Sequence, residues 1–126
     1  EAGDFDSAAI VLTFKNGVIC VINNCREASY GYDQRVEVFG SKGMVDTAND
    51  LHSRAVISTK DGVVGEKPLD FFMDRYTQAY VAEVTEFINA ILNDGKLTTC
   101  AADGLKSVEI AKAATQSAKT GAPVKL

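Results

Sequence analysis

The residues best able to do chemistry lie in one short stretch, Tyr30–Gly43. It begins Tyr-Gly-Tyr-Asp-Gln-Arg and ends Gly-Ser-Lys-Gly, with a short apolar alternation between the two. A phenol hydroxyl both donates and accepts hydrogen bonds, so Tyr30 and Tyr32 suit a ligand that carries several hydroxyl groups. Gly31 between them allows an unusual backbone angle or a close approach of a ligand. Two tyrosines around a glycine are equally compatible with cross-strand aromatics of a core.

The polar neighbours of these tyrosines suggest two different roles. We expect Asp33 and Arg35 to form a structural pair that fixes the turn. Asn23, Asn24 and Arg26 precede the tyrosines and are secondary candidates for contacts with a ligand.

Other motifs in the sequence give weaker indications of function. Gly40-Ser41-Lys42-Gly43 lacks the spacing of a phosphate-binding loop, so we expect a hairpin turn there. The sequence contains no Gly-x-Gly-x-x-Gly, the pattern that cradles a dinucleotide pyrophosphate. His52, the only histidine, stands in a polar connection and is expected to be exposed rather than catalytic.

Composition narrows the class of protein. A chain of 126 residues with 46% hydrophobic residues is long enough for one domain. A net charge of −4 disfavours binding to nucleic acid and to anionic membranes. The longest apolar runs fall far short of the roughly 20 residues of a membrane helix. Cys20 and Cys25 would point to opposite faces of one strand, and Cys100 follows much later. We therefore expect three reduced thiols, no zinc site and a cytoplasmic protein.

The expected elements are strands first and helices second. Short alternating runs bounded by Gly turns predict strands over residues 8–14, 18–26, 34–40, 44–47, 54–59 and 63–66. Apolar residues at three- and four-residue steps then predict a helix over about 71–93. A second helix is expected from near Asp103 to near Gly121. The predicted fold is α+β: an open, mostly antiparallel sheet with two C-terminal helices packed on one face.

Several of the strands are apolar on both faces. Val18, Cys20 and Ile22 would face one way, while Ile19 and Val21 would face the other. An exposed apolar face usually marks an interface, so we expect a homo-oligomer, dimer or tetramer, formed through the sheet face. Loops or a segment outside the chain could cover that face instead.

Two stretches resemble a known family. Residues 31–40 resemble the substrate-domain strand of inositol 2-dehydrogenases, members of the glucose–fructose oxidoreductase/inositol dehydrogenase family. Residues 68–80 resemble the start of that family's long helix, and residues 103–106 and 121–126 resemble its C-terminus. The resemblance thus covers nearly the whole chain. One departure is Cys25, where the family often has serine.

The resemblance implies roles for particular residues. In the family a tyrosine of this element reaches the substrate pocket facing the nicotinamide, a role that falls to Tyr32 first and Tyr30 second, with Asn24 as a further contact. Arg75 or Tyr76 would border the pocket from the helix. Glu66-Lys67-Pro68 repeats the letters of the family's catalytic Glu-Lys-Pro but follows a late strand instead of a strand of the nucleotide-binding domain. We therefore expect no catalytic residue in this chain.

The resemblance also implies a function. Residues 1–126 would be a single C-terminal substrate-binding and oligomerisation domain, without the N-terminal dinucleotide-binding domain; that residue 1 is Glu rather than Met favours this. The parent would be an NAD-dependent inositol 2-dehydrogenase that oxidises myo-inositol to an inosose, with no activity, cofactor or metal expected in this chain alone. The alternatives are a related sugar or polyol dehydrogenase and a free-standing binding or assembly module. This sequence is compatible with several polyols, with NAD or NADP, and with a dimer or a tetramer.

Overall fold

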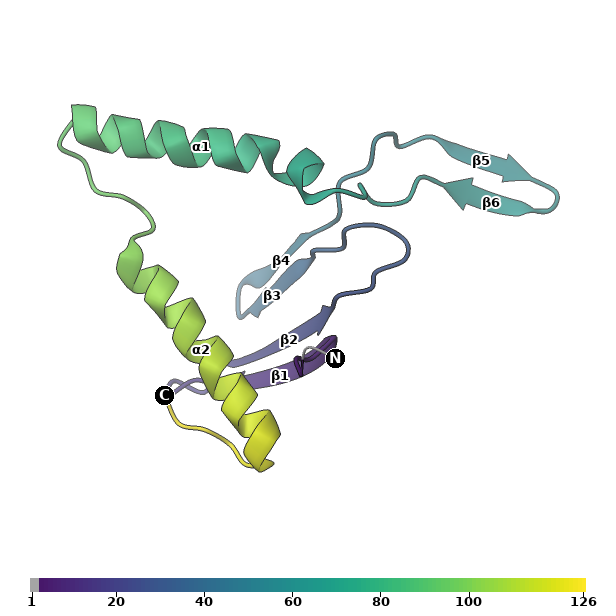
Figure 1. The fold of residues 1–126 in the computed structure, drawn as a ribbon. Helices are drawn as coiled ribbons and strands as arrows, with labels where there is room; N and C mark the ends of the chain where they lie inside the picture. Colours follow the sequence, from purple (N-terminus) through teal and green to yellow (C-terminus); the bar gives the residue numbers. More distant parts are fainter. Residues whose placement is uncertain (1–2) are drawn as a thin grey trace. The chain divides into compact units, whose positions relative to one another are not determined.

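The computed structural model describes residues 3–126 and confirms the α+β class (Figure 1). The strands are β1 (Ser7–Thr13), β2 (Ile19–Cys25), β3 (Val36–Gly40), β4 (Gly43–Thr47), β5 (Val56–Thr59) and β6 (Gly62–Gly65). The helices are α1 (Phe72–Leu92) and α2 (Ala101–Thr120). All eight predicted elements are therefore present in the predicted order, with ends that differ by one or two residues.

The strands pair as three separate hairpins, not as one continuous ladder. The pairs are β1 with β2, β3 with β4, and β5 with β6. Val38 faces Val45 in the antiparallel second pair, and Ile57 faces Val64 in the third. The links between the hairpins are irregular. Main-chain N–H groups in these links donate to a side chain or to the carbonyl groups of distant links. No further ladder joins the hairpins within residues 3–126.

The chain divides into two compact units, which are described separately below. Unit 1 comprises the described part of Glu1–Ser7 together with Asn24–Val81, and unit 2 comprises Ala8–Asn23 and Ala82–Leu126. Unit 1 holds β3 to β6 and the beginning of α1. Unit 2 holds most of the β1–β2 hairpin, the rest of α1 and all of α2.

The first hairpin turns at Asn16 and Gly17, as their sequence predicts. Gly17 has a φ of +84°, in the left-handed region that glycine enters without steric cost. The N–H of Phe14 donates to the carbonyl of Val18 at 2.9 Å, and the N–H of Gly17 donates back to Phe14 at 2.9 Å. The Asn16 side chain accepts a further bond from the Val18 N–H at 3.2 Å. Both residues of the turn therefore stabilise it.

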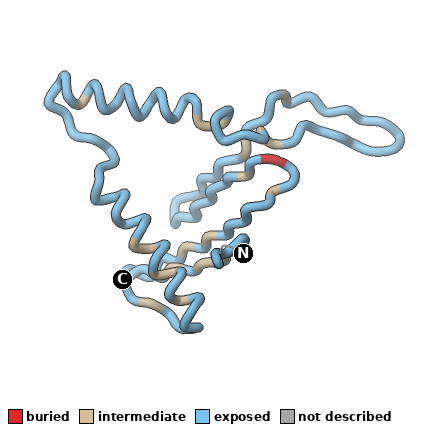
Figure 2. Tube along the Cα trace, in the orientation of Figure 1, coloured by how far each residue is buried: buried red, intermediate tan, exposed pale blue. Residues whose placement is uncertain are grey.

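Alternation along β1 and β2 separates two faces. One face is half-buried and carries Ala8, Ile10, Leu12, Cys20 and Ile22. On the other face, Val11, Ile19 and Val21 are 66%, 66% and 61% exposed. No hydrophobic side chain is fully buried among the described residues, and most of the trace in Figure 2 is coloured as exposed. The predicted apolar outer face is therefore present and uncovered in this chain.

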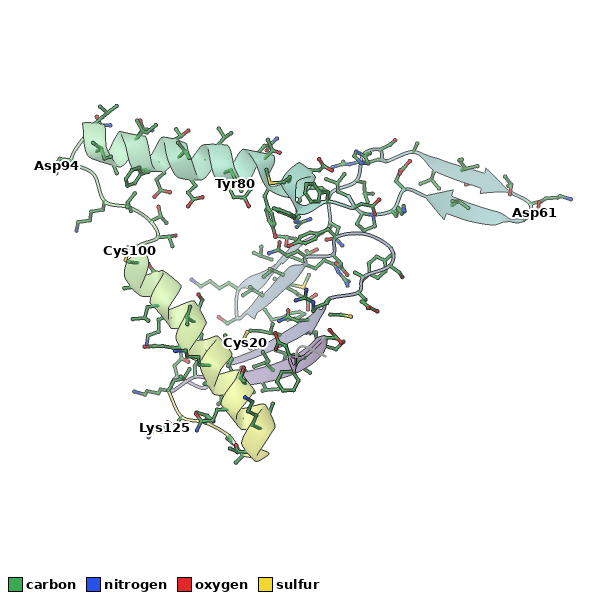
Figure 3. All side chains as sticks on the ribbon, in the orientation of Figure 1. Cys20, Asp61, Tyr80, Asp94, Cys100 and Lys125 are labelled. Carbon is green, nitrogen blue, oxygen red and sulfur yellow. The ribbon has the colours of Figure 1, made fainter. Side chains whose placement is uncertain are left out.

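Both ends of α2 follow from the sequence. Cys100, labelled at the start of α2 in Figure 3, donates its N–H to Asp103 Oδ2 at 2.8 Å, which satisfies a main-chain donor at the helix start. That hydrogen bond also lowers the pKa of Asp103 below its usual value. Gly121, with a φ of +67°, ends the helix and donates to the Ser117 carbonyl at 2.8 Å.

Within residues 3–126, neither helix combines the length and the apolar character that crossing a membrane requires.

Candidate functional site

The candidate site lies in unit 1, and its backbone turns at Gly31. This residue is buried and has a φ of +133°, which side-chain-bearing residues rarely adopt. A Cβ atom here would lie 2.5 Å from the carbonyl oxygen of Pro68. The next residue, Tyr32, donates its N–H to the Leu69 carbonyl at 2.7 Å. The unusual backbone angle expected at Gly31 is confirmed, and the close approach is made by another part of the chain.

Asp33 is the hub of the polar residues in this segment. Its carboxylate accepts hydrogen bonds from Arg35 Nε and Nη2, both at 2.8 Å, from Asn49 Nδ2 at 2.6 Å, and from the Tyr30 hydroxyl. The Asp33 side chain is only 13% exposed. These donors, Arg35 first and then Tyr30 and Asn49, hold the pKa of Asp33 well below its usual range. The expected structural pair of Asp33 and Arg35 is confirmed.

The same contacts shift the pKa values of Tyr30 and Arg35, the neighbours of Asp33. Donation to the carboxylate raises the pKa of the Tyr30 phenol, because ionisation would lose this hydrogen bond. The carboxylate likewise raises the pKa of Arg35. Tyr30 therefore keeps its proton and has an acceptor fixed on its hydroxyl, while its oxygen can still accept a bond from a ligand.

Three tyrosines form a row beside this network. Tyr32 meets Tyr76 edge to face, with ring centroids 5.9 Å apart and an interplanar angle of 84°. Tyr76 in turn meets Tyr80, labelled on α1 in Figure 3, at 6.4 Å and 78°. A hydrogen bond with the Tyr32 side chain raises the pKa of Tyr76. Tyr32 and Tyr80 are exposed, so this row offers both ring edges and hydroxyl groups to a ligand.

Asn49 and Arg75 also belong to the network. The N–H of Gln34 donates to Asn49 Oδ1 at 2.8 Å, and Arg75 Nη2 donates to the Gln34 carbonyl at 2.8 Å. Sequence reasoning considered Arg75 only as a lining residue and missed Asn49 altogether. Asn49 follows β4 in an irregular link, and nothing in its local sequence distinguishes it from any other loop asparagine.

The structure brings together some of the predicted residues and not others. Tyr30, Tyr32, Arg75 and Tyr76 meet in this network. Asn24 lies exposed near the end of β2, and within residues 3–126 no hydrogen bond joins it to the network.

Lys67 and His52 lie at the surface, as the sequence predicts. Lys67 is 64% exposed, and its Nζ is 3.9 Å from Asp70, an exposed i,i+3 pair. His52 is exposed in the link after β4. The Glu-Lys-Pro segment nevertheless has a structural role, because the Pro68 carbonyl packs closely against Gly31.

Three glycines with positive φ lie beside strands. Gly17, Gly43 and Gly62 have positive φ, but each lies in or at the end of a hairpin turn and leads into a strand. A pyrophosphate site needs a glycine-rich turn that opens a helix. In residues 3–126 there is likewise no group of three or more His, Cys, Asp or Glu that could hold a metal ion.

Unit 2 contains an open groove of about 1180 Å³ between β1 and α2. Its walls include Ile10 and Leu12 on the strand, Ile110 and Ala114 on the helix, and the C-terminal residues. None of the candidate site residues lines it. It is the gap between an apolar strand face and an alanine-rich helix.

Comparison with known proteins identifies relatives over the full chain. A family model described as "Oxidoreductase family, C-terminal alpha/beta domain" matches residues 1–126. An uncharacterized oxidoreductase, YrbE, of Bacillus subtilis is 45% identical over 126 residues, which are 100% of this chain and 37% of that protein. An inositol 2-dehydrogenase of Rhizobium meliloti is 43% identical over 117 residues, 93% of this chain and 36% of that protein. The chain thus spans little more than a third of the length of these relatives.

Solved structures agree with the sequence comparison. A putative myo-inositol dehydrogenase from Sinorhizobium meliloti superposes with a TM-score of 0.91 at 42% identity, over 95% of this chain and 36% of that one. A scyllo-inositol dehydrogenase from Lactobacillus casei, solved with bound NAD(H) and scyllo-inositol, superposes with a TM-score of 0.84 at 25% identity. That match covers 96% of this chain and 36% of the other. Both relatives share the α+β fold of this chain.

Proposed function

This chain belongs to the oxidoreductase family defined by a C-terminal alpha/beta domain, and on that premise we propose that it is the substrate domain of an NAD-dependent inositol 2-dehydrogenase. The parent enzyme oxidises a ring hydroxyl of myo-inositol to the ketone of an inosose. The 43% identity to an inositol 2-dehydrogenase supports this substrate class. In this proposal the chain itself recognises the polyol and does not carry out the hydride transfer.

The observation that carries the proposal is the pair of exposed phenols, Tyr30 and Tyr32, on a segment that a hydrogen-bonded network holds in place. Tyr32 and Tyr30 would bond to ring hydroxyls, since each phenol oxygen can accept a bond and Tyr32 can also donate one. Tyr76 supports Tyr32 through their edge-to-face contact. Asn24 remains a secondary candidate for a contact with the polyol. Rigid, closely spaced donors and acceptors suit a ring that carries a hydroxyl on every carbon.

The cofactor would be held outside this chain. Bound nicotinamide supplies the acceptor for the hydride that leaves the alcohol carbon. No Gly-x-Gly-x-x-Gly occurs in the sequence, and Gly17, Gly43 and Gly62, which have positive φ, lie in or beside hairpin turns, so these residues do not fit a dinucleotide pyrophosphate. NAD bound in the scyllo-inositol dehydrogenase supports this cofactor for the parent. The isolated chain would therefore be inactive.

We also propose that the protein is a cytoplasmic homo-oligomer. The exposed Val11, Ile19 and Val21 face of the first hairpin would be covered by a second copy of the protein, giving a dimer or tetramer. The three free cysteines agree with a reducing, cytoplasmic setting.

The test is turnover by the full-length protein. Reduced nicotinamide is followed by absorbance with myo-inositol, scyllo-inositol, glucose and no substrate. We expect turnover with an inositol, and we expect Tyr32→Phe to lower kcat/KM by about 3- to 10-fold, the value of one hydrogen bond between neutral groups. Arg54→Ala, at an exposed position before β5, serves as the control. Absence of turnover with both inositols would refute the proposed substrate. Turnover by residues 1–126 alone would refute the proposal that hydride transfer needs residues outside this chain.

A related polyol is a second candidate. The relative solved with bound scyllo-inositol favours testing other ring polyols. A higher kcat/KM for scyllo-inositol or glucose than for myo-inositol would decide for this candidate.

A further inference from the structure

The segment that carries Tyr30 and Tyr32 has no regular secondary structure. It lies between β2 and β3, and β3 begins only at Val36. An irregular segment keeps a single shape only if its polar groups find partners elsewhere. Those partners therefore determine where the two phenols stand.

The first anchor is the side chain of Asn49. Its Oδ1 accepts from the Gln34 N–H at 2.8 Å and from Arg75 Nη1 at 3.5 Å, while its Nδ2 donates to Asp33 Oδ1 at 2.6 Å. The first of these bonds fixes the main chain, and the last fixes the carboxylate that holds Tyr30. A carboxamide can accept on one atom and donate on the other, whereas an ionised carboxylate can only accept. The asparagine side chain therefore meets both needs at this position, whereas an ionised aspartate would meet only one.

The second anchor is Arg75 in the first turn of α1. Its guanidinium donates to the Gln34 carbonyl at 2.8 Å, so Gln34 is held at both its N–H and its carbonyl. The following residue, Tyr76, meets the ring of Tyr32. The start of α1 thus holds the main chain through one residue and the ring of Tyr32 through the next.

From these contacts we propose that Asn49 and Arg75 are positioning residues that hold Tyr30 and Tyr32 in the geometry that receives the polyol. This inference rests on the proposed function. Asn49 acts on Tyr30 through Asp33 and on Tyr32 through the main chain at Gln34. Arg75 fixes the same main chain from the helix. Loss of either anchor leaves both phenols in the protein but lets the segment that carries them move.

The test compares four variants of the full-length protein: Asn49→Ala, Asn49→Asp, Arg75→Ala and, as control, Arg54→Ala. Arg54 is exposed in the link before β5 and has no partner in residues 3–126. The first readout is hydrogen exchange of the peptide that contains residues 31–35. The second is the separation of KM from kcat with inositol.

We expect that peptide to exchange faster than in the wild type in all three network variants. In Arg54→Ala its exchange rate should equal that of the wild type. We expect kcat/KM to fall by about 10-fold or more, mainly through KM, because displaced phenols lose substrate binding before they affect the chemical step. Asn49→Asp should be no better than Asn49→Ala at neutral pH, since its carboxylate would face that of Asp33 and cannot donate to it. If Asn49→Ala does not fold, Arg75→Ala carries the same test.

Unchanged exchange in the network variants overturns the proposal, and so does faster exchange with unchanged kcat/KM. A wild-type protein without turnover on any polyol refutes the proposed function. In that case the exchange of residues 31–35 still decides whether Asn49 and Arg75 fix this segment. The two failures are thus distinguishable.

Discussion

The α-carbon of Gly31 stands so close to Pro68 that a Cβ atom at residue 31 would lie 2.5 Å from the Pro68 carbonyl oxygen. That contact, together with the bond from the Tyr32 N–H to Leu69, seats the tyrosine segment against the link that leads into α1. Gly31 is therefore needed both for its backbone angle and for the space it leaves.

Gly31→Ala should destabilise the fold by roughly 2–4 kcal/mol, because it combines backbone strain at a φ of +133° with a clash against main chain. The control is Gly104→Ala in α2, where a Cβ would meet nothing within 4 Å. That change should stabilise by about 1 kcal/mol, the difference in helix propensity. Urea unfolding of the two variants measures both effects. Equal stability of the two variants would show that residues 31 and 68 do not meet as described.

Asp33→Asn should reduce the decrease in the free energy of unfolding that occurs on going from neutral to acid pH. The folded-state pKa of Asp33 lies below its unfolded value of about 3.9, so its ionisation stabilises the fold above roughly pH 4. This contribution is lost as the pH falls through the folded pKa. The wild type should therefore lose more stability than Asp33→Asn between neutral and strongly acid pH, as measured by unfolding midpoints. Asp61→Asn, at the exposed turn between β5 and β6 in Figure 3, is the control variant. Parallel curves for Asp33→Asn and wild type would contradict this role.

Tyr30→Phe should have the complementary effect in alkali. The hydrogen bond to Asp33 raises the folded-state pKa of Tyr30 above its unfolded value of about 10. Its contribution is fully present below the unfolded pKa and is lost as the pH rises through the folded pKa. The variant should therefore be less stable than wild type near neutrality and should lose less on going to high pH. Tyr80→Phe is the control, and an identical alkaline slope in the two variants would argue against a special environment for Tyr30.

Val21→Lys tests the proposed assembly. Val21 is 61% exposed on the outer face of β2, so the change costs little in a monomer. In a dimer packed through this face it would bury an unpaired charge, which costs several kcal/mol. Light scattering of the full-length protein should show dissociation in Val21→Lys and not in Gln116→Lys, an exposed position of α2. A wild-type monomer, or a Val21→Lys variant that still assembles, would rule out this face as the interface.

Local patterns determined much of the fold. The Asn16-Gly17 turn, the two-faced alternation of β1 and β2, and both ends of α2 are properties of neighbouring residues, and all were predictable. The pairing of Asp33 with Arg35 was predictable for the same reason, since the two are separated by a single residue.

Tertiary structure alone decided what surrounds the tyrosines. Asn49 is 16 residues from Asp33 along the chain, Arg75 is 41 residues from Gln34, and Pro68 reaches Gly31 from a different link. The division of the strands into three hairpins also depended on such contacts, because the links bond to distant groups and do not continue a ladder. Periodicity reports only which face of an element is apolar. Which distant residue satisfies a polar group depends on how the chain returns on itself, and no local pattern encodes that.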